Sequence, residues 1–302
     1  MDRRSFLKIH NAAADEAWSL FCNRLRRFVH GAWESLAESS DGYPQARLQL
    51  ERTLDFDHVR ALAEQYDIAL VLDGTLPFDA LIGRPGLWLK LPQTMEEPDF
   101  FSEEACLAPA TTLVGTLLEQ GYEQFRGVPP LLNLAQWFAD PHYHDMRPGL
   151  SFLSGVERMQ VVFANGDKAV VGGFGVNDTS PLNIAILHKA IPQLFEMLEQ
   201  TQIREALEAP IWPYAYRFDA LHNKHVDPNI ARVFLGHRGS LLWVQSLVIR
   251  KIPPLQRLLR TAAEWQQGYA EGLCGGEADL EIKQLFDPAG MYPYFDELFK
   301  TF

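Results

Sequence analysis

The segment FADPHYHDMRPG, residues 138–149, holds the densest group of chemically reactive side chains in the sequence. Asp140, His142, His144 and Asp145 are all residue types that bind divalent metals. A metal site needs ligands that converge from rigid elements, such as two histidines four residues apart on a helix. Here the histidines are two residues apart and prolines bound the segment, so we predict no metal site. A loop at an interface and a loop beside a cofactor stay open as alternatives.

A second polar group lies in HNKHVD, residues 222–227. Asn223 and Lys224 have side chains that can donate hydrogen bonds to a carboxylate or a cofactor, and a solvated loop is the alternative. Elsewhere the sequence has no GxSxG, Walker, HExxH or cysteine–histidine nucleophile pattern. The common motifs of hydrolases and nucleoside triphosphatases are therefore missing from the sequence.

Composition excludes some classes of partner. The chain has 302 residues, of which 47% are hydrophobic and 22% charged, as in an ordinary globular protein. Its formal net charge is −12, with acidic and basic residues mixed along the sequence. Nucleic acids and anionic membranes attract proteins through lysine and arginine, so neither is an expected partner.

Cysteine usage and the N-terminus bear on the cellular compartment. The three cysteines are far apart and odd in number, which indicates reduced thiols rather than disulfides or a thiolate metal site. No apolar run approaches the roughly 20 residues of a membrane-spanning helix. The N-terminal DRRSFLK is similar to a twin-arginine export motif, but the apolar stretch of about 7–15 residues that should follow is missing. We therefore expect a cytoplasmic protein, with export, or membrane association through a partner, as the alternatives.

Hydrophobic periodicity and turn residues predict the elements that position these groups. An amphipathic helix with an aromatic stripe, serving as core or as a docking face, is expected over residues 14–37. Strands are expected at 68–72, 87–91 and 240–252, a hairpin around Asn165-Gly166, and helices before Gly121, over 183–201 and on both sides of Gly275-Gly276. Helices interspersed with isolated strands and a hairpin indicate an α+β or mixed α/β fold.

Four segments, taken in order, resemble the FAD-linked oxidases of the vanillyl-alcohol oxidase and p-cresol methylhydroxylase type. The nearest comparison is the FAD-binding subunit of glycolate oxidase. The sharpest segment, RVFLGHRGSLLWVQSLVIRKIP (232–253), is similar to the family's apolar run, GSEGTLG and strand ending in proline. The others are DFDHVRALAEQYDIALVLDGTLPFDALIGRPGLWLKLP, then ACLAPATTLVGTLLEQGYEQFRGVPP with SGVERMQVVFANGDKAVVGGFG, and finally LEIKQLFDPAGMYPY.

The resemblance implies an α+β fold in which two subdomains clasp an extended FAD. It divides the chain into an N-terminal helical segment (1–54), an FAD-binding-type domain (55–253) and a C-terminal helical segment with an FDP motif (254–302). The family usually carries a separate substrate cap as well. Only a short segment separates Pro254, which directly follows the segment 232–253, from the FDP motif. The cap is therefore expected to be reduced or absent.

The resemblance also implies which residues would hold FAD, and the sequence departs from the family there. Glycine-rich loops hold a diphosphate through backbone N–H groups, often at positive φ. The expected FAD-binding residues are Asp73, Gly74, Thr75, Leu76, Pro77, Gly149, Gly155, Gly236, Arg238 and Gly239. Asp73 places a carboxylate where the diphosphate should lie, and Pro77 has no N–H to donate. His142, His144 and Lys224 are the expected catalytic residues beside the flavin.

Two hypotheses follow from this comparison. In the first, the chain is an FAD-linked oxidoreductase subunit that oxidises a small 2-hydroxy acid, such as glycolate or lactate, together with a partner chain. In the second, it is a flavin-free relative that serves as a structural or assembly subunit. The surviving Gly74, Gly236 and Gly239 favour the first hypothesis, and the glycine losses at 73–77 and 131–145 favour the second.

Overall fold

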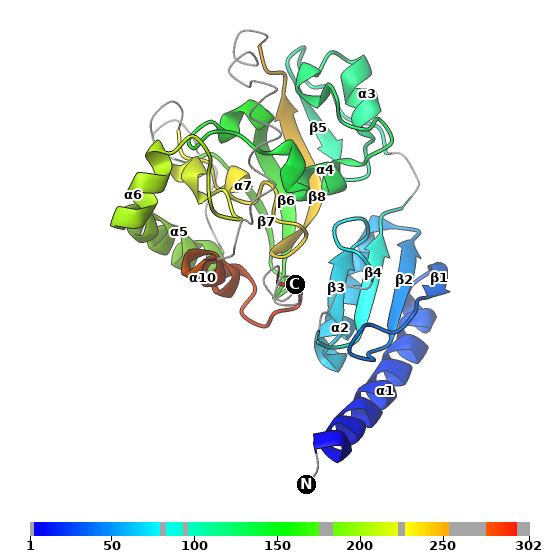
Figure 1. Cartoon of the computed structure of the whole chain (residues 1–302). Helices are drawn as coiled ribbons and strands as arrows, with labels where there is room; N and C mark the ends of the chain where they lie inside the picture. The colour runs from blue at the N-terminus through cyan, green and yellow to red at the C-terminus, as the bar shows by residue number, and fades with distance from the viewer. Residues whose placement is uncertain are drawn as a thin grey trace.

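The chain folds around two four-stranded sheets, one formed by its N-terminal third and the other by its middle and C-terminal parts (Figure 1). The computed structural model describes residues 3–78, 83–92, 96–174, 184–222, 227–253 and 276–294, with side chains from residue 15 onward. The α+β class predicted from the sequence is confirmed. A reduced cap is not shown, since residues 254–275 lie outside the described residues.

The first sheet has the strand order β1-β2-β4-β3. Its strands are β1 (Gly31–Ser35), β2 (Gln45–Leu50), β3 (Ala69–Leu72) and β4 (Gly86–Lys90). The last three run parallel, and β1 is antiparallel to β2. All four residues of β3 are buried. A continuous apolar run is typical of a parallel strand covered on both faces, which explains this sequence.

The N-terminal helix begins and ends earlier than its aromatic spacing predicts. Helix α1 (Arg3–Phe28) ends before β1, whereas the sequence indicated a helix to residue 37. The β1 strand instead brings Trp33 back to Trp18, with ring centroids 6.2 Å apart. Tertiary packing thus satisfies these aromatic side chains in place of a continuous helix. A domain boundary after residue 54 would also cut the first sheet, because β1 and β2 belong to it.

The second sheet is antiparallel, with the order β5-β8-β6-β7. Its strands are β5 (Ala105–Pro109), β6 (Val156–Phe163), β7 (Lys168–Gly172) and β8 (Leu242–Arg250). The predicted hairpin at Asn165-Gly166 joins β6 to β7, with Gly166 at φ +88°. Residue types that favour positive φ therefore fixed this turn locally.

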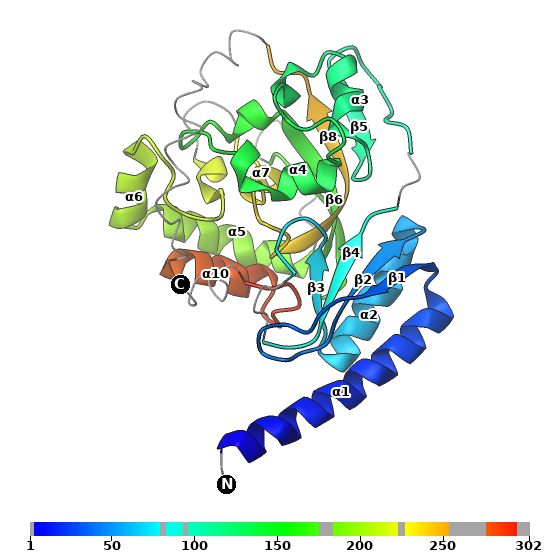
Figure 2. The same cartoon turned by 45° about the vertical axis from the view of Figure 1, so that its right-hand side comes forward.

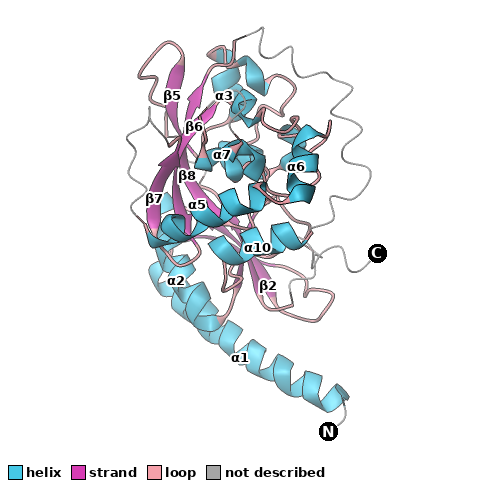
Figure 3. Ribbon diagram, turned by 90° about the vertical axis from the view of Figure 1, so that its left-hand side faces the viewer, coloured by secondary structure: helices cyan, strands magenta, loops and turns pink. Residues whose placement is uncertain are grey.

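Helices cover the sheets. Helix α2 (Phe56–Tyr66) packs on α1 beside the first sheet, and α5 (Ala185–Leu198), α6 (Thr201–Glu208), α7 (Ile230–Val233) and α10 (Glu277–Phe286) lie beside the second (Figures 2 and 3). Helix α5 contains Pro192, as predicted, and packs on α10. The remaining helices are α3 (Val114–Glu119), α4 (Leu134–Ala139) and the 3-10 turns Thr53–Asp55, Glu123–Phe125, Pro141–Tyr143, Ser151–Ser154 and Phe218–Leu221.

One apolar core joins the two sheets. Phe56 of α2 stacks on Trp243 of β8, with ring centroids 4.3 Å apart and 10° between the ring planes. The FDP motif adds a second connection, because the buried Asp287 accepts hydrogen bonds from the backbone of residues 291 and 292. The carbonyl of Met291 in turn accepts a bond from Leu70 of β3. The C-terminal segment therefore connects the second unit, which is the second sheet with its helices, to the edge of the first unit, which is the first sheet with α1 and α2.

Two further predictions concern the cysteines and the membrane. Cys22 is partly exposed, Cys106 is buried, both thiols are free, and Cys274 lies outside the described residues. Burial raises the pKa of Cys22 to about 11, so this thiol stays protonated at neutral pH. In the described part of the chain, no helix has the length and apolarity needed to cross a bilayer.

Candidate functional site

Three of the predicted FAD-binding segments meet between the two sheets. They are the loop that follows β3, the α4 segment with the 3-10 turn after it, and the turn that precedes β8. Together they line a pocket of about 180 Å³, formed by Gly74, Thr75, Ala139, Asp140, Pro141, His142 and Arg238. The structure thus brings together residues that are more than 160 positions apart in the sequence.

The loop after β3 uses its own polar groups internally. The Asp73 N–H donates to Leu89 O over 2.8 Å, and the Thr75 N–H donates to Leu72 O over 3.1 Å. The Thr75 hydroxyl also donates to Leu72 O, over 2.7 Å. Pro77 has no N–H, and Leu76 packs beside the small cluster of Ala69, Val71 and Trp88. These groups are therefore not available to a bound diphosphate.

The side chain of Asp73 lies on the first sheet. Its Oδ1 is 3.4 Å from Nε of Arg47, which also pairs with Glu34 over 2.7 Å. The guanidinium of Arg47 lies over the ring of Phe78, 4.3 Å from the ring centroid. Arg47 is therefore already paired with two carboxylates, which leaves it little capacity to bind a phosphate.

A glutamine from the second unit covers the loop. Nε2 of Gln136 on α4 donates to Asp73 O over 2.9 Å. Gly74 has φ +87°, and a Cβ built on it would lie 2.6 Å from the same nitrogen. Asn133 caps α4 and fixes this glutamine, accepting from its N–H and donating to its Oε1 over 2.9 and 2.8 Å. Gln136 therefore fills the space above the glycine.

The turn before β8 packs against both units. Gly236, at φ +73°, donates to Phe138 O over 2.8 Å, and a Cβ there would lie 2.9 Å from Cα of Pro141. Gly239, also at φ +73°, would place a Cβ 3.3 Å from Cβ of Leu72. These two glycines permit close approach of protein to protein, whereas the resemblance implied close approach to a cofactor.

Arg238 has an unusual backbone. Its φ is +53°, in the left-handed region that costs a residue with a Cβ roughly 1–2 kcal/mol. A hydrogen bond from its N–H to Ala139 O, 2.7 Å long, holds this conformation. The residue lines the pocket, so it is the cation closest to Gly74 and Thr75 in the pocket wall.

The two candidate catalytic histidines lie in different surroundings. His142 is exposed, and its Nδ1 lies 2.7 Å from Oδ1 of Asp140 at the pocket wall. His144 is 2% exposed, and its Nε2 lies 2.9 Å from the carbonyl oxygen of Trp137. Its ring packs edge-on against the Trp137 ring, with centroids 4.8 Å apart. The structure therefore places His142 at the pocket and His144 in the core.

The remaining candidates do not join this pocket. Gly149 donates its N–H to Asp219 Oδ2 over 2.9 Å, beside the buried ion pair between Asp219 and Arg217. Gly155 lies against Arg250 O at the far end of the second sheet. Lys224 lies outside the described residues. Within those residues, no group of three or more His, Cys, Asp and Glu side chains is arranged to hold a metal ion.

Three residues important to this region were not among the site residues predicted from the sequence. Asn133 and Gln136 are three apart in NLAQ, which resembles a helix-capping pattern and could have indicated the start of α4. His237, 2% exposed, lies between the two glycines of the turn. Burial and the nearby Lys283 lower the pKa of His237 to about 3, so the ring is neutral at physiological pH.

The pocket does not fit the diphosphate of FAD. Ligand pockets for drug-sized molecules have volumes of about 300–1,000 Å³, and this one has about 180 Å³. Gln136 covers the glycine that should approach the cofactor, and the Asp73 carboxylate lies on the same loop. The space above Gly74 and the N–H groups of Asp73 and Thr75 are used by contacts within the protein.

No protein-family model and no curated protein matches the sequence. Solved structures that match in part include alkyldihydroxyacetonephosphate synthase, at 10% identity and TM-score 0.38, covering 69% of this chain. BBE-like 1 of Physcomitrella patens matches at 12% identity and TM-score 0.41 over 76% of this chain. Glucooligosaccharide oxidase from Acremonium strictum, a protein with a 6-S-cysteinyl, 8α-N1-histidyl FAD, matches at 11% identity and TM-score 0.37 over 70% of this chain. This chain spans 32%, 44% and 36% of those three chains, and likeness at this level carries no functional conclusion.

Proposed function

We propose that this protein is a flavin-free relative of FAD-linked oxidases and serves as a structural or assembly subunit. The observation that carries the proposal is the contact between Gln136 and the loop after β3. The side-chain amide of Gln136 takes the position above Gly74 and binds the carbonyl of Asp73. A loop that binds a diphosphate needs that approach to be open.

The charge of the pocket supports the same proposal. Asp73 and Asp140 bring two carboxylates to the loop and to the pocket wall. The dianionic diphosphate of FAD would have to bind beside both, with Arg238 as the cation in the wall. Like charges in a partly buried site disfavour binding. Arg47 already pairs with Asp73, so Arg238 in the wall would have to offset both Asp140 and the diphosphate.

The alternative function is an FAD-linked oxidoreductase acting on a small 2-hydroxy acid with a partner chain. It would place His142 beside the flavin as an acid, a base or a hydrogen-bond donor. The exposed His142–Asp140 pair is compatible with such a role, because an imidazole beside a carboxylate is a common proton-transfer unit. The packing around Gly74, Gly236 and Gly239 favours the flavin-free alternative over this one.

A partner subunit is part of the proposal, since an assembly role requires one. The described part of α1 does not present its aromatic stripe to a partner. Trp18 stacks on Phe21, and Phe21 and Leu25 are buried. Leu20 and Phe28 are 49% and 58% exposed on the same helix, and they are its large exposed apolar side chains within residues 15–28.

The flavin content of the purified protein tests this proposal. Protein prepared without added cofactor should show no visible band near about 450 nm, where oxidised flavin absorbs, and should release no flavin on denaturation. A yellow preparation that releases about one FAD per chain would overturn the flavin-free assignment and favour the oxidoreductase.

A further inference from the structure

A larger pocket lies at the end of the second sheet that is remote from the first. Its volume is about 660 Å³, within the range of about 300–1,000 Å³ typical of small-molecule sites. The lining residues come from the start of β6, the end of β8, α7 and the segments around β5. Phe152, Ile252 and Pro253 supply an apolar wall, and charged side chains and two glycines supply the rest. This pocket is separate from the one at Gly74.

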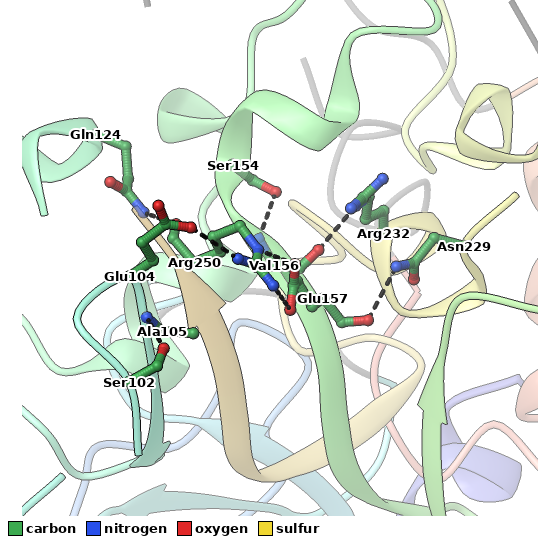
Figure 4. Close-up of polar contacts among 10 residues, drawn as sticks. All are labelled: Ser102, Glu104, Ala105, Gln124, Ser154, Val156, Glu157, Asn229, Arg232 and Arg250. Carbon is green, nitrogen blue, oxygen red and sulfur yellow. Dashed lines mark hydrogen bonds and ion pairs between the residues drawn. The ribbon is translucent and has the colours of Figure 1, made fainter. Parts of the chain in front are cut away.

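The charged groups of this pocket are mostly paired. Arg250 bonds Glu157 through Nε and Glu104 through a terminal nitrogen, the latter over 3.1 Å (Figure 4). Glu123 pairs with Arg126 over 2.5 Å. The acidic residues of the wall therefore each have a cationic partner. Two further cations line the pocket, Arg232 and Lys251, and neither forms an ion pair with a carboxylate among the described residues.

A bulge at the start of β6 sets the positions of these groups. The register between β6 and β8 shifts between Val156 and Arg158, so Glu157 is the extra residue. Its carboxylate turns to Arg250, and its carbonyl oxygen accepts from Nδ2 of Asn229 over 2.9 Å. Bulges of this kind re-aim side chains and occur often beside functional sites. Here the Glu157 carboxylate pairs with Arg250, and Arg232 bonds the carbonyl oxygen of Val156 instead.

Arg232 is held so that part of its guanidinium faces the pocket. Nε donates to Val156 O over 2.7 Å, which is its only hydrogen bond within the described residues. Figure 4 shows the terminal nitrogens turned away from this carbonyl. Burial lowers the pKa of Arg232 to about 10, although Glu157 nearby partly offsets the effect. A buried arginine still carries its charge at neutral pH, and such a charge is stabilised by an anionic partner.

We propose that this pocket binds a small organic acid that has one carboxylate and an apolar body. The carboxylate bonds the terminal nitrogens of Arg232, and Lys251, which also lines the pocket, adds attraction. The apolar body lies against Phe152 and Ile252. A single negative charge suits the site better than a phosphate, because Glu104 and Glu157 also line it and repel a dianion. The proposal does not depend on whether the chain binds flavin.

Calorimetric titration with matched acids and amides tests the proposal. The probes are benzoate and butyrate, with benzamide and butyramide as neutral analogues of the same shape. The two acids should bind, each about tenfold or more tighter than its amide, because the charge-assisted bonds to Arg232 are lost in the amide. Equal binding of acid and amide, or no binding of either acid, would overturn the proposal.

Variants locate the site. Arg232→Gln should weaken benzoate binding about tenfold or more. Arg232→Lys should weaken it less, because lysine keeps the positive charge but lacks the paired N–H donors of the guanidinium. Arg204→Gln, an exposed arginine on α6, is the control and should bind as the parent protein does. Unfolding curves show whether each variant folds. If Arg232→Gln does not fold, Phe152→Ala is informative, and it should weaken benzoate more than acetate. An unchanged benzoate affinity in both variants would place the site elsewhere.

Discussion

The turn at residues 236–239 shows at single-residue scale how the protein uses glycines at positive φ. Gly236 and Gly239 lie against Pro141 and Leu72, so their missing side chains let two protein segments touch. Arg238 between them adopts the same left-handed region despite its Cβ. A glycine pattern in the sequence shows that close approach occurs, but it does not show what approaches. For this reason the resemblance to a flavin-binding motif did not fix the function of the turn.

Two alanine substitutions separate the cost of positive φ from the cost of close packing. Gly149 and Gly236 have φ of +74° and +73°, but only Gly236 has a neighbour within 4 Å of the position that an alanine methyl group would take. Gly149→Ala should lower the free energy of unfolding by about 1 kcal/mol, the cost of the backbone conformation. Gly236→Ala should lower it by at least about 1 kcal/mol more, because Pro141 has to move. Chemical denaturation measures both, and equal losses would contradict the packing described here.

The buried His237 makes stability depend on pH. Its pKa is about 3 in the folded protein, below the ordinary value of 6.5, so the unfolded chain binds a proton that the folded chain does not. The free energy of unfolding is therefore unaffected by this titration above about pH 6.5, and it falls as the pH is lowered from there toward 3. The slope is about 1.4 kcal/mol per pH unit.

His237→Gln removes this titration and is the matched variant. Denaturation at a series of pH values between about 4 and 6 should give a shallower loss of stability in the variant than in the parent protein, by about one proton. Identical slopes would show that His237 titrates normally and is not held neutral by its surroundings.

At the scale of elements, α4 carries Gln136, the side chain that covers the loop after β3. Asn133 begins the helix and orients Gln136, which reaches the carbonyl of Asp73. Asn133→Ala should therefore lower the free energy of unfolding by about 1 kcal/mol, as is usual for loss of an N-cap. The backbone amide of Gln136 should also exchange its hydrogen faster, because its acceptor is removed.

Gln202→Ala, on the exposed face of α6, is the control for this prediction. It should change stability by no more than about 0.5 kcal/mol, the usual effect of a surface substitution. If Asn133→Ala lowers the free energy of unfolding no more than Gln202→Ala does, the buried side chains of α4 hold the helix without the Asn133 cap.

Elements whose cause is local were predictable from the sequence. The β6–β7 hairpin follows from Asn165-Gly166, and β3 follows from a short apolar run. Strand β1 was not predictable, because Trp33 continues the helical aromatic spacing and only its contact with Trp18 shows the alternative. The bulge at Glu157 also depends on pairing with β8, a strand more than 80 residues away in sequence. Sequence alone cannot give such partners.

At the scale of the whole molecule, the two sheets share one core. Phe56 stacks on Trp243, and Arg60 of α2 donates to Ala164 O at the β6–β7 hairpin over 3.0 Å. We expect the two units to unfold in a single transition, since neither keeps its core closed without the other. Denaturation followed by near-ultraviolet and far-ultraviolet circular dichroism should give coincident curves. Two separated transitions would show that the units are independent domains.

The candidate site was predictable in part at this scale. The resemblance brought the segments at 73–77, 138–149 and 236–239 into one region, and the structure has them lining one pocket or packing around it. The resemblance did not predict that Gln136 closes the loop or that His144 is buried. Both depend on how α4 docks on the first sheet, a contact between residues far apart in sequence.

Equilibrium titration of the purified protein with FAD tests the central claim most directly. Calorimetry or flavin fluorescence anisotropy reports binding without any assumption about substrate or activity. We predict no saturable binding of FAD up to about 1 mM, because Gln136 and the loop contacts occupy its site. Saturable binding of FAD with a stoichiometry of one per chain would contradict the flavin-free assignment.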